Sequence, residues 1–433
     1  MGVKASIVLV VLASMMLFAA RPLISQDDQV DIAELKKTAL KVYLDCGGYC
    51  DLEYIKTEIT FVNYVRDRKE ADAHVLITTQ STGSGGREYT LTFIGQNGFG
   101  DVNDVQKYFS NKTDTEDDVR RGLAKALKLG LMSYVGRTPI ADRIAINFLG
   151  RPETGPVRDK WNFWLFSLSA GGWFSGEESY TSRSVDTSFS ANRVTERSKV
   201  RMSFSLDSSK NTYVIEDETI EGIRRSWDAS GLFVWSLGEH WSAGFYLDVD
   251  SSTYSNIDLG WSIAPAIEFD LFPYTQSTRR QLRFLYRLSL NPIRYREQTV
   301  FGKTRETLFR ESLSVTLDLK EKWGTITGSL SGSHFFHDFG KYRLNAFGVV
   351  NLNIHKGLSL FVMGGRTWVH DQLSLRLRDP TLEELLLQTI EFPTTSDWFG
   401  SIGIQFTFGS IFTNVINPRF GSSGGGGMMI YIE

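Results

Sequence analysis

Short stretches in the last 270 or so residues alternate apolar and polar side chains with a period of two. The clearest stretch carries its apolar residues at Ile257, Leu259, Trp261, Ile263, Pro265, Ile267, Phe269 and Leu271. Successive side chains of a strand point to opposite faces, so one face is apolar and the other is small, polar and acidic. A membrane barrel turns the apolar face to lipid and keeps the polar face in its lumen. The pattern recurs about a dozen times, and we interpret it as an outer-membrane β-barrel. A soluble β-sandwich is the alternative, and solubility of the mature chain without detergent would establish it.

The composition limits the class of protein. The 433 residues include 47 basic and 50 acidic ones, a formal net charge of -3. A nucleic-acid partner is not expected, because a nucleic-acid binder shows a basic excess or stripe. Aromatic residues make up 13% of the chain, which fits the girdles at both interfaces of a membrane barrel.

The N-terminus predicts export. Lys4 precedes an apolar run over residues 5–20, which is suited to the core of a signal peptide. We assign residues 1–26 to this signal, with cleavage expected between Ala19 and Asp27. The predicted location is the outer membrane of a bacterial cell, with the N-terminal domain in the periplasm.

The two cysteines, Cys46 and Cys50, lie close together in sequence. An exported chain meets an oxidising compartment, so a local disulfide is the first interpretation. A metal or redox site and free thiols are the alternatives. Zinc would need two more ligands at a recognised spacing, and no cofactor or metal is expected.

Residues 27–150 read as a small αβ domain with the order β-α-β-β-β-α-β. A helix is expected after a cap at Thr113 or Asp114, because Val119, Leu123, Leu127 and Leu131 recur at a helical period up to Gly136. The other elements are expected at 40–45, 52–58, 61–65, 73–80, 88–95 and 144–149.

This segment resembles the amino-terminal domain of TolB and related periplasmic αβ modules. The resemblance lies in residues 61–66 (FVNYVR), 71–77 (ADAHVLI) and 89–93 (YTLTF). It covers about 100 residues and implies a periplasmic protein-interaction module. The cysteine pair and the absence of a following β-propeller are departures from that family.

Residues 151–160 contain Pro152, Gly155 and Pro156 and are expected to be a linker. The barrel is expected over 161–409, in about 12 strands, followed by a Gly/Ser-rich tail over 410–433. The predicted strands are 161–174, 195–207, 211–221, 224–237, 241–254, 256–271, 280–293, 306–319, 323–336, 342–355, 358–373 and 397–408. Tight turns are expected at 208–210, 238–240, 320–322 and 355–357, and long loops at 175–194, 294–305 and 374–396. Short turns face the periplasm in such barrels, and an even strand count leaves both ends of the barrel there.

Charges of both signs recur at positions expected to face the lumen. An ionised side chain facing lipid costs roughly 2–4 kcal/mol at the midplane for Arg or Lys. The predicted lumen charge network is Lys199, Arg201, Asp248, Asp250, Asp258, Glu268, Asp270, Arg283, Arg287, Arg310 and Arg343. It either cross-links a plugged lumen through ion pairs or sets up a transverse field in a narrow channel for a polar solute.

No catalytic set emerges from the remaining motifs. His334 and His337 form the one histidine cluster, and their spacing on a strand puts them on opposite faces. A membrane-embedded hydrolase would need a nucleophile with a matching base, so an enzyme is not expected. The favoured hypothesis is a barrel that anchors a periplasmic interaction domain, with a role in envelope assembly, scaffolding or transport. The alternative is a narrow channel for a small polar or charged solute. The expected partners are outer-membrane lipid and a periplasmic envelope protein.

Overall fold

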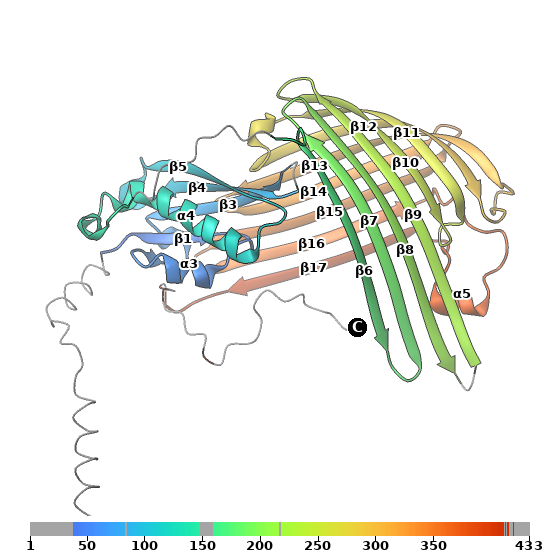
Figure 1. Cartoon of the computed structure of the whole chain (residues 1–433), viewed down its shortest axis with the longest axis horizontal. Helices are drawn as coiled ribbons and strands as arrows, with labels where there is room; N and C mark the ends of the chain where they lie inside the picture. Colours follow the sequence, from blue (N-terminus) through green and yellow to red (C-terminus); the bar gives the residue numbers. More distant parts are fainter. Residues whose placement is uncertain are drawn as a thin grey trace, which may run out of the picture.

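The computed structural model describes residues 38–82, 85–147, 159–215 and 218–410, together with residues 412, 414 and 419. The predicted signal peptide, most of the linker and most of the tail lie outside these residues. The described chain forms a small αβ domain and a large antiparallel sheet that curls on itself (Figure 1). No described helix has the length and apolar character needed to cross a membrane.

The αβ domain is a five-stranded sheet in the order β2-β1-β3-β4-β5. Its strands are β1 (Lys41–Asp45), β2 (Asn63–Tyr64), β3 (Ala73–Ser81), β4 (Arg87–Gly95) and β5 (Asn103–Ser110). Its helices are α3 (Leu52–Glu58) and α4 (Glu116–Val135), with short 3₁₀ turns at Arg68–Glu70, Asn97–Phe99 and Pro139–Arg143. β1 runs parallel to β2 and β3, and the β3-β4-β5 part is antiparallel.

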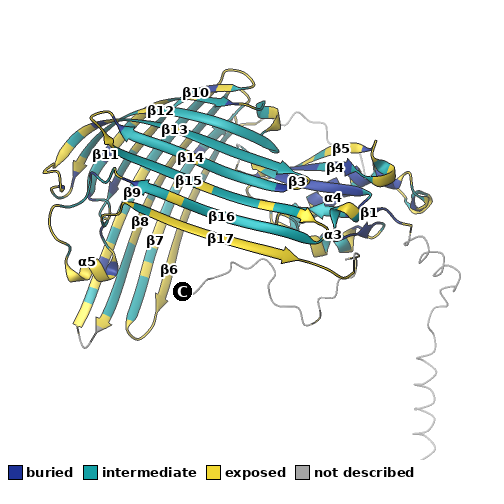
Figure 2. Ribbon diagram, turned by 180° about the vertical axis from the view of Figure 1, so that it is seen from behind, coloured by how far each residue is buried: buried dark blue, intermediate teal, exposed yellow. Residues whose placement is uncertain are grey.

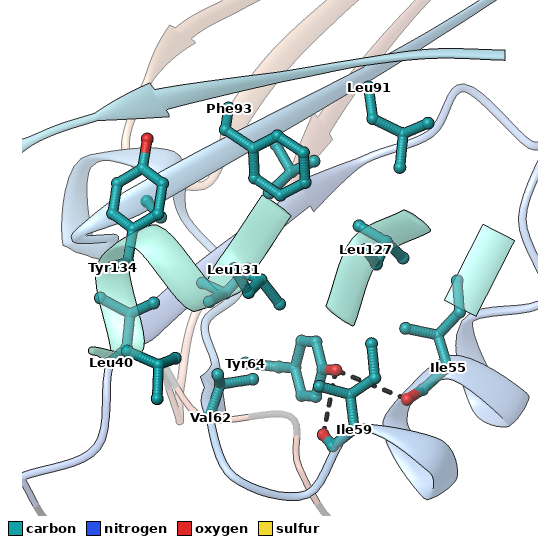
Figure 3. Close-up of a cluster of buried hydrophobic side chains, with 14 of the residues drawn as sticks. Leu40, Ile55, Ile59, Val62, Tyr64, Leu91, Phe93, Leu127, Leu131 and Tyr134 are labelled. Carbon is teal, nitrogen blue, oxygen red and sulfur yellow. Dashed lines mark hydrogen bonds between the residues drawn. The ribbon is translucent and has the colours of Figure 1, made fainter. Parts of the chain in front are cut away.

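Helix α4 covers one face of this sheet. Its N-cap is Thr115, which forms a capping box with Asp118 and lies one residue after Asp114 and two after Thr113. The helix ends at Gly136, as predicted. Leu127 and Leu131 are fully buried against Phe93 and Tyr134 in the domain core (Figure 3). The predicted helical face is therefore confirmed.

The expected elements of the αβ domain are partly confirmed. Cys46 and Cys50 form the predicted disulfide in the loop between β1 and α3. The strand β5 was not predicted, because its polar residues hide an alternation in which Val105 and Phe109 are exposed. The strand expected at 144–149 is absent over 144–147, the part of it that the structure describes.

The large sheet has 12 strands in sequence order, each hydrogen-bonded to the next. They are β6 (Trp164–Gly176), β7 (Tyr180–Val194), β8 (Ser198–Ile215), β9 (Glu218–Ser236), β10 (Trp241–Ser252), β11 (Ile257–Asp270), β12 (Arg280–Tyr295), β13 (Arg305–Glu321), β14 (Gly324–Phe335), β15 (Asp338–His355), β16 (Leu358–Val369) and β17 (Ser396–Phe406). The predicted number is confirmed, but the boundaries expected over β7 to β9 are wrong.

The first error is the long loop expected at 175–194, which contains strand β7. The second is the tight turn expected at 208–210, which lies inside the continuous strand β8. The strand expected at 211–221 therefore covers the end of β8 and the start of β9, and the break expected before 224 lies inside β9. One missed strand and one strand divided in two cancel in the count. The alternation of apolar and polar residues is hard to recognise in β7, because its outer face carries Arg183 and Thr187 as well as Val185 and Phe189.

The sheet differs from the expected closed barrel. The strand order ends at β6 and β17, and no pairing joins these two edge strands among the described residues. Both edges are largely exposed (Figure 2). The αβ domain contacts both limbs of the sheet at one end, where it separates the start of β6 from the end of β17 (Figure 1).

The connections divide between two ends of the sheet. At one end lie 195–197, 237–240, 271–279, 322–323 and 356–357, together with the start of β6 and the end of β17. At the other end lie 177–179, 253–256, 296–304, 336–337 and the 26-residue segment 370–395, which contains α5 (Leu382–Leu387). We call these the short-turn end and the long-loop end. The αβ domain lies at the short-turn end, as the even strand count predicts.

Candidate functional site: the polar inner face

The two faces of the large sheet differ in chemistry. One face carries the apolar run Leu168, Phe189, Phe204, Ala229, Val249 and Trp261 in a single row across six strands. The opposite face carries the row Ser167, Ser190, Ser203, Ser230, Asp248 and Ser262. The αβ domain and the segment 370–395 both contact the second face, so it lies inside the curl.

Hydroxyl pairs connect neighbouring strands on this inner face. Ser169 Oγ lies 2.7 Å from Ser188 Oγ, and Ser203 Oγ lies 2.6 Å from Ser230 Oγ. A hydroxyl both donates and accepts, so such a surface suits water or a polar solute.

An acidic wall follows the inner face of β7 to β10. It consists of Asp186, Asp207, Asp228, Asp248 and Asp250. Asp186 pairs directly with Asp207 across two strands, and Asp228 pairs with Asp250. Like charges directly opposite one another destabilise a sheet, so this arrangement needs water or cations nearby. Asp186, Asp207 and Asp228 were not predicted, although the alternating Ser182, Ser184, Asp186, Ser188 and Ser190 was a signal for an inner face.

A basic wall follows the inner face of β12 to β15. It consists of Arg283, Arg287, Arg310 and Arg343, and Lys199 and Arg201 add cations at the start of β8. Arg287 lies over the Tyr246 ring, with its guanidinium carbon 5.0 Å from the ring centre. Arg310 lies within electrostatic range of Arg287, Arg343 and Asp371.

Few of the predicted charges neutralise one another. Arg283 Nε lies 3.8 Å from Glu268 Oε2, a long ion pair, and Arg343 pairs with Asp371 at 2.9 Å. Among the described residues, no ion pair joins the five-aspartate wall to the four-arginine wall. Ion pairs therefore do not link these two walls to each other in the described chain.

Two predicted network members have local roles. Asp270 is buried, and its carboxylate accepts hydrogen bonds from the backbone N–H groups of Phe272 and Leu282 at 3.2 and 3.1 Å. It caps the turn after β11, because the chain reverses there and leaves N–H groups to satisfy. Asp258 pairs with Arg294 at 2.6 Å near the long-loop end.

The inner face is not polar throughout. On β15 to β17 it carries Phe347, Val349, Phe361, Met363 and Phe399, which alternate with a second apolar set on the outer face. The ring centres of Phe347 and Phe399 lie 6.3 Å apart. An apolar strip therefore lies beside the exposed edge β17.

The segment 370–395, which we call the strap, crosses the long-loop end. Arg224 of β9 donates to the carbonyl oxygens of Leu387 and Gln388, and Asn256 Nδ2 donates to Ser374 O at 2.9 Å. The strap thus connects β16 to the β9 and β10–β11 region (Figure 1). Within the strap, Leu382–Leu387 form the short helix α5, capped by Thr381.

A compact ion cluster holds the strap. Arg378 contacts Glu297 and Glu384 at 2.6 Å each, and Arg376 contacts Glu297 at 2.8 Å. The hydrogen bond from Arg378 lowers the pKa of Glu384 to about 2, and Arg378 also holds the pKa of Glu297 below its usual value. Both carboxylates are therefore charged at neutral pH.

The αβ domain docks at the short-turn end. Asp67 Oδ2 accepts the N–H of Gly357 at 2.8 Å, Arg68 donates to Asn353 O at 3.2 Å, and Lys356 pairs with Glu70. On the other limb, Lys112 Nζ donates to Ser167 Oγ of β6 at 2.5 Å. The domain thus spans from β6 to the β15–β17 side across the mouth.

The described histidines do not form a metal centre. His334 Nε2 lies 2.6 Å from Glu311 Oε1 on the outer face, and Glu311 also accepts from the Tyr286 hydroxyl. His337 lies in the turn after β14. In the described part of the chain, no three potential ligand side chains gather to hold a metal.

Comparisons with known proteins give structural matches alone. No family model and no curated protein matches the chain. Of the solved structures, the NanC porin is 14% identical, with a TM-score of 0.27 over 56% of this chain and 99% of its own. The translocator domain of the autotransporter NalP from Neisseria meningitidis is 8% identical, with a TM-score of 0.20 over 57% of this chain and 87% of its own.

Proposed function

We propose that the large sheet spans the bacterial outer membrane and conducts a small polar or charged solute, with the αβ domain at its periplasmic mouth. The observation that carries the proposal is the pair of oppositely charged inner walls, which are not joined by ion pairs in the described chain. Facing walls of opposite charge produce a transverse field that orients a dipolar solute. Membrane placement is supported by the apolar outer face and by its aromatic boundaries.

The outer face of β9 illustrates those boundaries. Its outward run begins at Trp227, passes Ala229, Gly231 and Phe233, and ends at Trp235. Eight residue steps along a strand span roughly 25 Å, which is the height of the apolar band in membrane barrels. Tryptophan is favoured at both membrane interfaces.

Both mouths carry a partial cover. The strap covers part of the long-loop end, and the αβ domain covers part of the short-turn end. A passive open pore needs neither, so we propose that passage requires displacement of at least one cover.

Single-channel conductance of the refolded full-length protein in planar bilayers tests the proposal. The double variant Arg283→Gln/Arg287→Gln removes half of the basic wall and is expected to shift ion selectivity toward cations. Arg279→Gln, in the turn outside the lumen, is the matched control. A protein that inserts but passes no ions under any condition would overturn the channel.

A second function rests on the αβ domain. β5 is an edge strand with no partner on its outer side among the described residues, and it exposes Val105 at 53% and Phe109 at 57%. An unpaired edge can accept a strand from another protein. We propose as the alternative that this edge recruits a periplasmic envelope protein. A photo-crosslinking residue at Val105 of the full chain would capture that partner, while one at Leu129 on α4 would not.

A further inference from the structure

The outer face changes character at a sharp boundary near the long-loop end. On β8 the apolar run ends at Leu206 and is followed by Ser208, and on β9 it ends at Trp227 beside Arg225. These positions pair directly, Leu206 with Trp227 and Ser208 with Arg225. Within one residue pair, the surface therefore changes from apolar to cationic.

A recess of about 580 Å³ lies on this boundary. Val185, Leu206 and Trp227 line its apolar side, and Arg225, Arg296 and Thr253 line its polar side. Asp207 and Ser226 also border it, but their register places them on the inner face. The recess is therefore half apolar and half cationic.

The two guanidinium groups at this recess lack acidic partners. Arg296 donates to Ile257 O at 3.1 Å and to Ser251 Oγ at 2.7 Å, which are both uncharged. Arg225 forms no ion pair with any described residue. Two guanidinium groups that line one recess and form no ion pair favour binding of an anion, and they suit the oxygens of a phosphate.

The same combination recurs further round the rim. A second recess of about 430 Å³ is lined by Leu259 and Trp261 together with Arg294 and Arg305. Arg294 is neutralised by Asp258, but Arg305 has no ion pair among the described residues. A tryptophan beside an unpaired arginine thus occurs at two places on the same boundary.

We propose that the Arg225–Arg296 recess binds the phosphate headgroup of an anionic membrane lipid in the leaflet at the long-loop end. The lipid chains would lie against Val185, Leu206 and Trp227, and the phosphate would contact the two guanidinium groups. This inference depends on the membrane placement of the proposed function. It assigns a lipid ligand to an outer site that is separate from the polar interior.

Lipid retention tests the site. Full-length protein is inserted into phosphatidylcholine nanodiscs containing a minority of phosphatidylglycerol, extracted in mild detergent, and analysed for bound lipid by native mass spectrometry. The wild-type protein is expected to retain phosphatidylglycerol in preference to phosphatidylcholine. Two lost charge-assisted hydrogen bonds should lower this retention by roughly a hundredfold in Arg225→Ala/Arg296→Ala. The control Arg197→Ala/Lys322→Ala removes two exposed cations from short turns and should retain the lipid.

The outcomes separate this inference from the proposed function. Insertion with no preference for phosphatidylglycerol overturns the lipid site and leaves the channel standing. Failure to insert at all overturns both. Release of the lipid by millimolar inorganic phosphate would show a simple anion site, and this would also overturn the lipid assignment.

Discussion

The αβ domain buries most of its large apolar side chains, whereas the large sheet exposes many of them. In the αβ domain, Phe93, Leu127 and Tyr134 are fully buried between sheet and helix. In the large sheet, Trp398, Ile402 and Ile404 are 76%, 74% and 74% exposed. Burial against protein stabilises the first part, whereas the second needs an apolar medium around it to gain the same free energy. One sequence therefore encodes domains for two different solvents.

The largest expected effect comes from opening the core of the αβ domain. Leu127 is fully buried, so Leu127→Ala should destabilise the domain by about 2–5 kcal/mol through lost burial and a cavity. The large sheet should keep its heat-modifiable mobility on a gel, because in the described chain the core around Leu127 contains residues of the αβ domain alone. Limited proteolysis of the full-length protein at increasing urea measures the change.

Leu129→Ala on the same helix is the control, because Leu129 is 58% exposed. If Leu127→Ala destabilised the αβ domain and the large sheet equally, the two parts would fold as one unit. This result would contradict the view that they are stabilised separately.

The complementary change tests the medium around the sheet. Leu247 lies on the outer face in the middle of β10, between Gly231 and Ile263. Leu247→Arg should cost about 2–4 kcal/mol if this face meets lipid, because the charge is desolvated. Urea titration of the protein refolded in vesicles measures it.

Ser230→Arg on the inner face of the neighbouring strand is the matched control, because the new cation would lie opposite Asp248. If both variants were equally stable in vesicles, the outer face would not contact lipid.

Periodicity made the large sheet predictable where the outer face is mostly apolar. From β10 to β17 each predicted strand matches one in the structure, because lipid-facing positions tolerate few exceptions. β7 to β9 extend past the apolar band, where Ser208, Lys210 and Arg225 occupy the outer face and the pattern loses its contrast. Predicted turns and loops fail in that region.

The candidate site was less predictable than the strands. Parity along a strand predicts which charges face inward, and Arg283, Arg287, Asp248 and Asp250 follow it. This parity cannot predict that the Asp270 carboxylate accepts backbone hydrogen bonds in a turn. Nor can it predict that Arg378 pairs with Glu297, 81 residues away in the sequence. Those contacts depend on how loops distant in sequence meet at one end of the sheet.

The strap gives a smaller effect than either hydrophobic change. Glu384→Gln removes one of the two carboxylates that hold Arg378, and this should loosen the strap by about 1 kcal/mol after allowance for its partial exposure. The pKa of folded Glu384 is depressed to about 2, so its contribution is present above its unfolded pKa and is lost as the pH falls toward 2.

The wild-type strap should therefore open only between about pH 4.5 and pH 2, measured as increasing proteolytic cleavage or conductance. Glu384→Gln should show partial opening at neutral pH and a weaker acid response. Glu383→Gln, a neighbouring acid on the same helix that makes no ion pair with a described residue, should behave as wild type. An unchanged acid response in Glu384→Gln would mean that another group controls the strap.

The smallest effect is expected where the two parts of the molecule meet. Lys356 pairs with Glu70 in an exposed position, and such pairs contribute little because water and salt screen them. Asp67 accepts a hydrogen bond from the Gly357 N–H, and this bond also positions the turn between β15 and β16.

Hydrogen exchange at the Gly357 amide therefore reports docking of the αβ domain. Lys356→Ala should speed that exchange by less than about threefold, whereas Asp67→Ala should speed it much more because the acceptor itself is removed. A large effect of Lys356→Ala that disappears at high salt would show that long-range charge, rather than the backbone hydrogen bond, keeps the domain on its sheet.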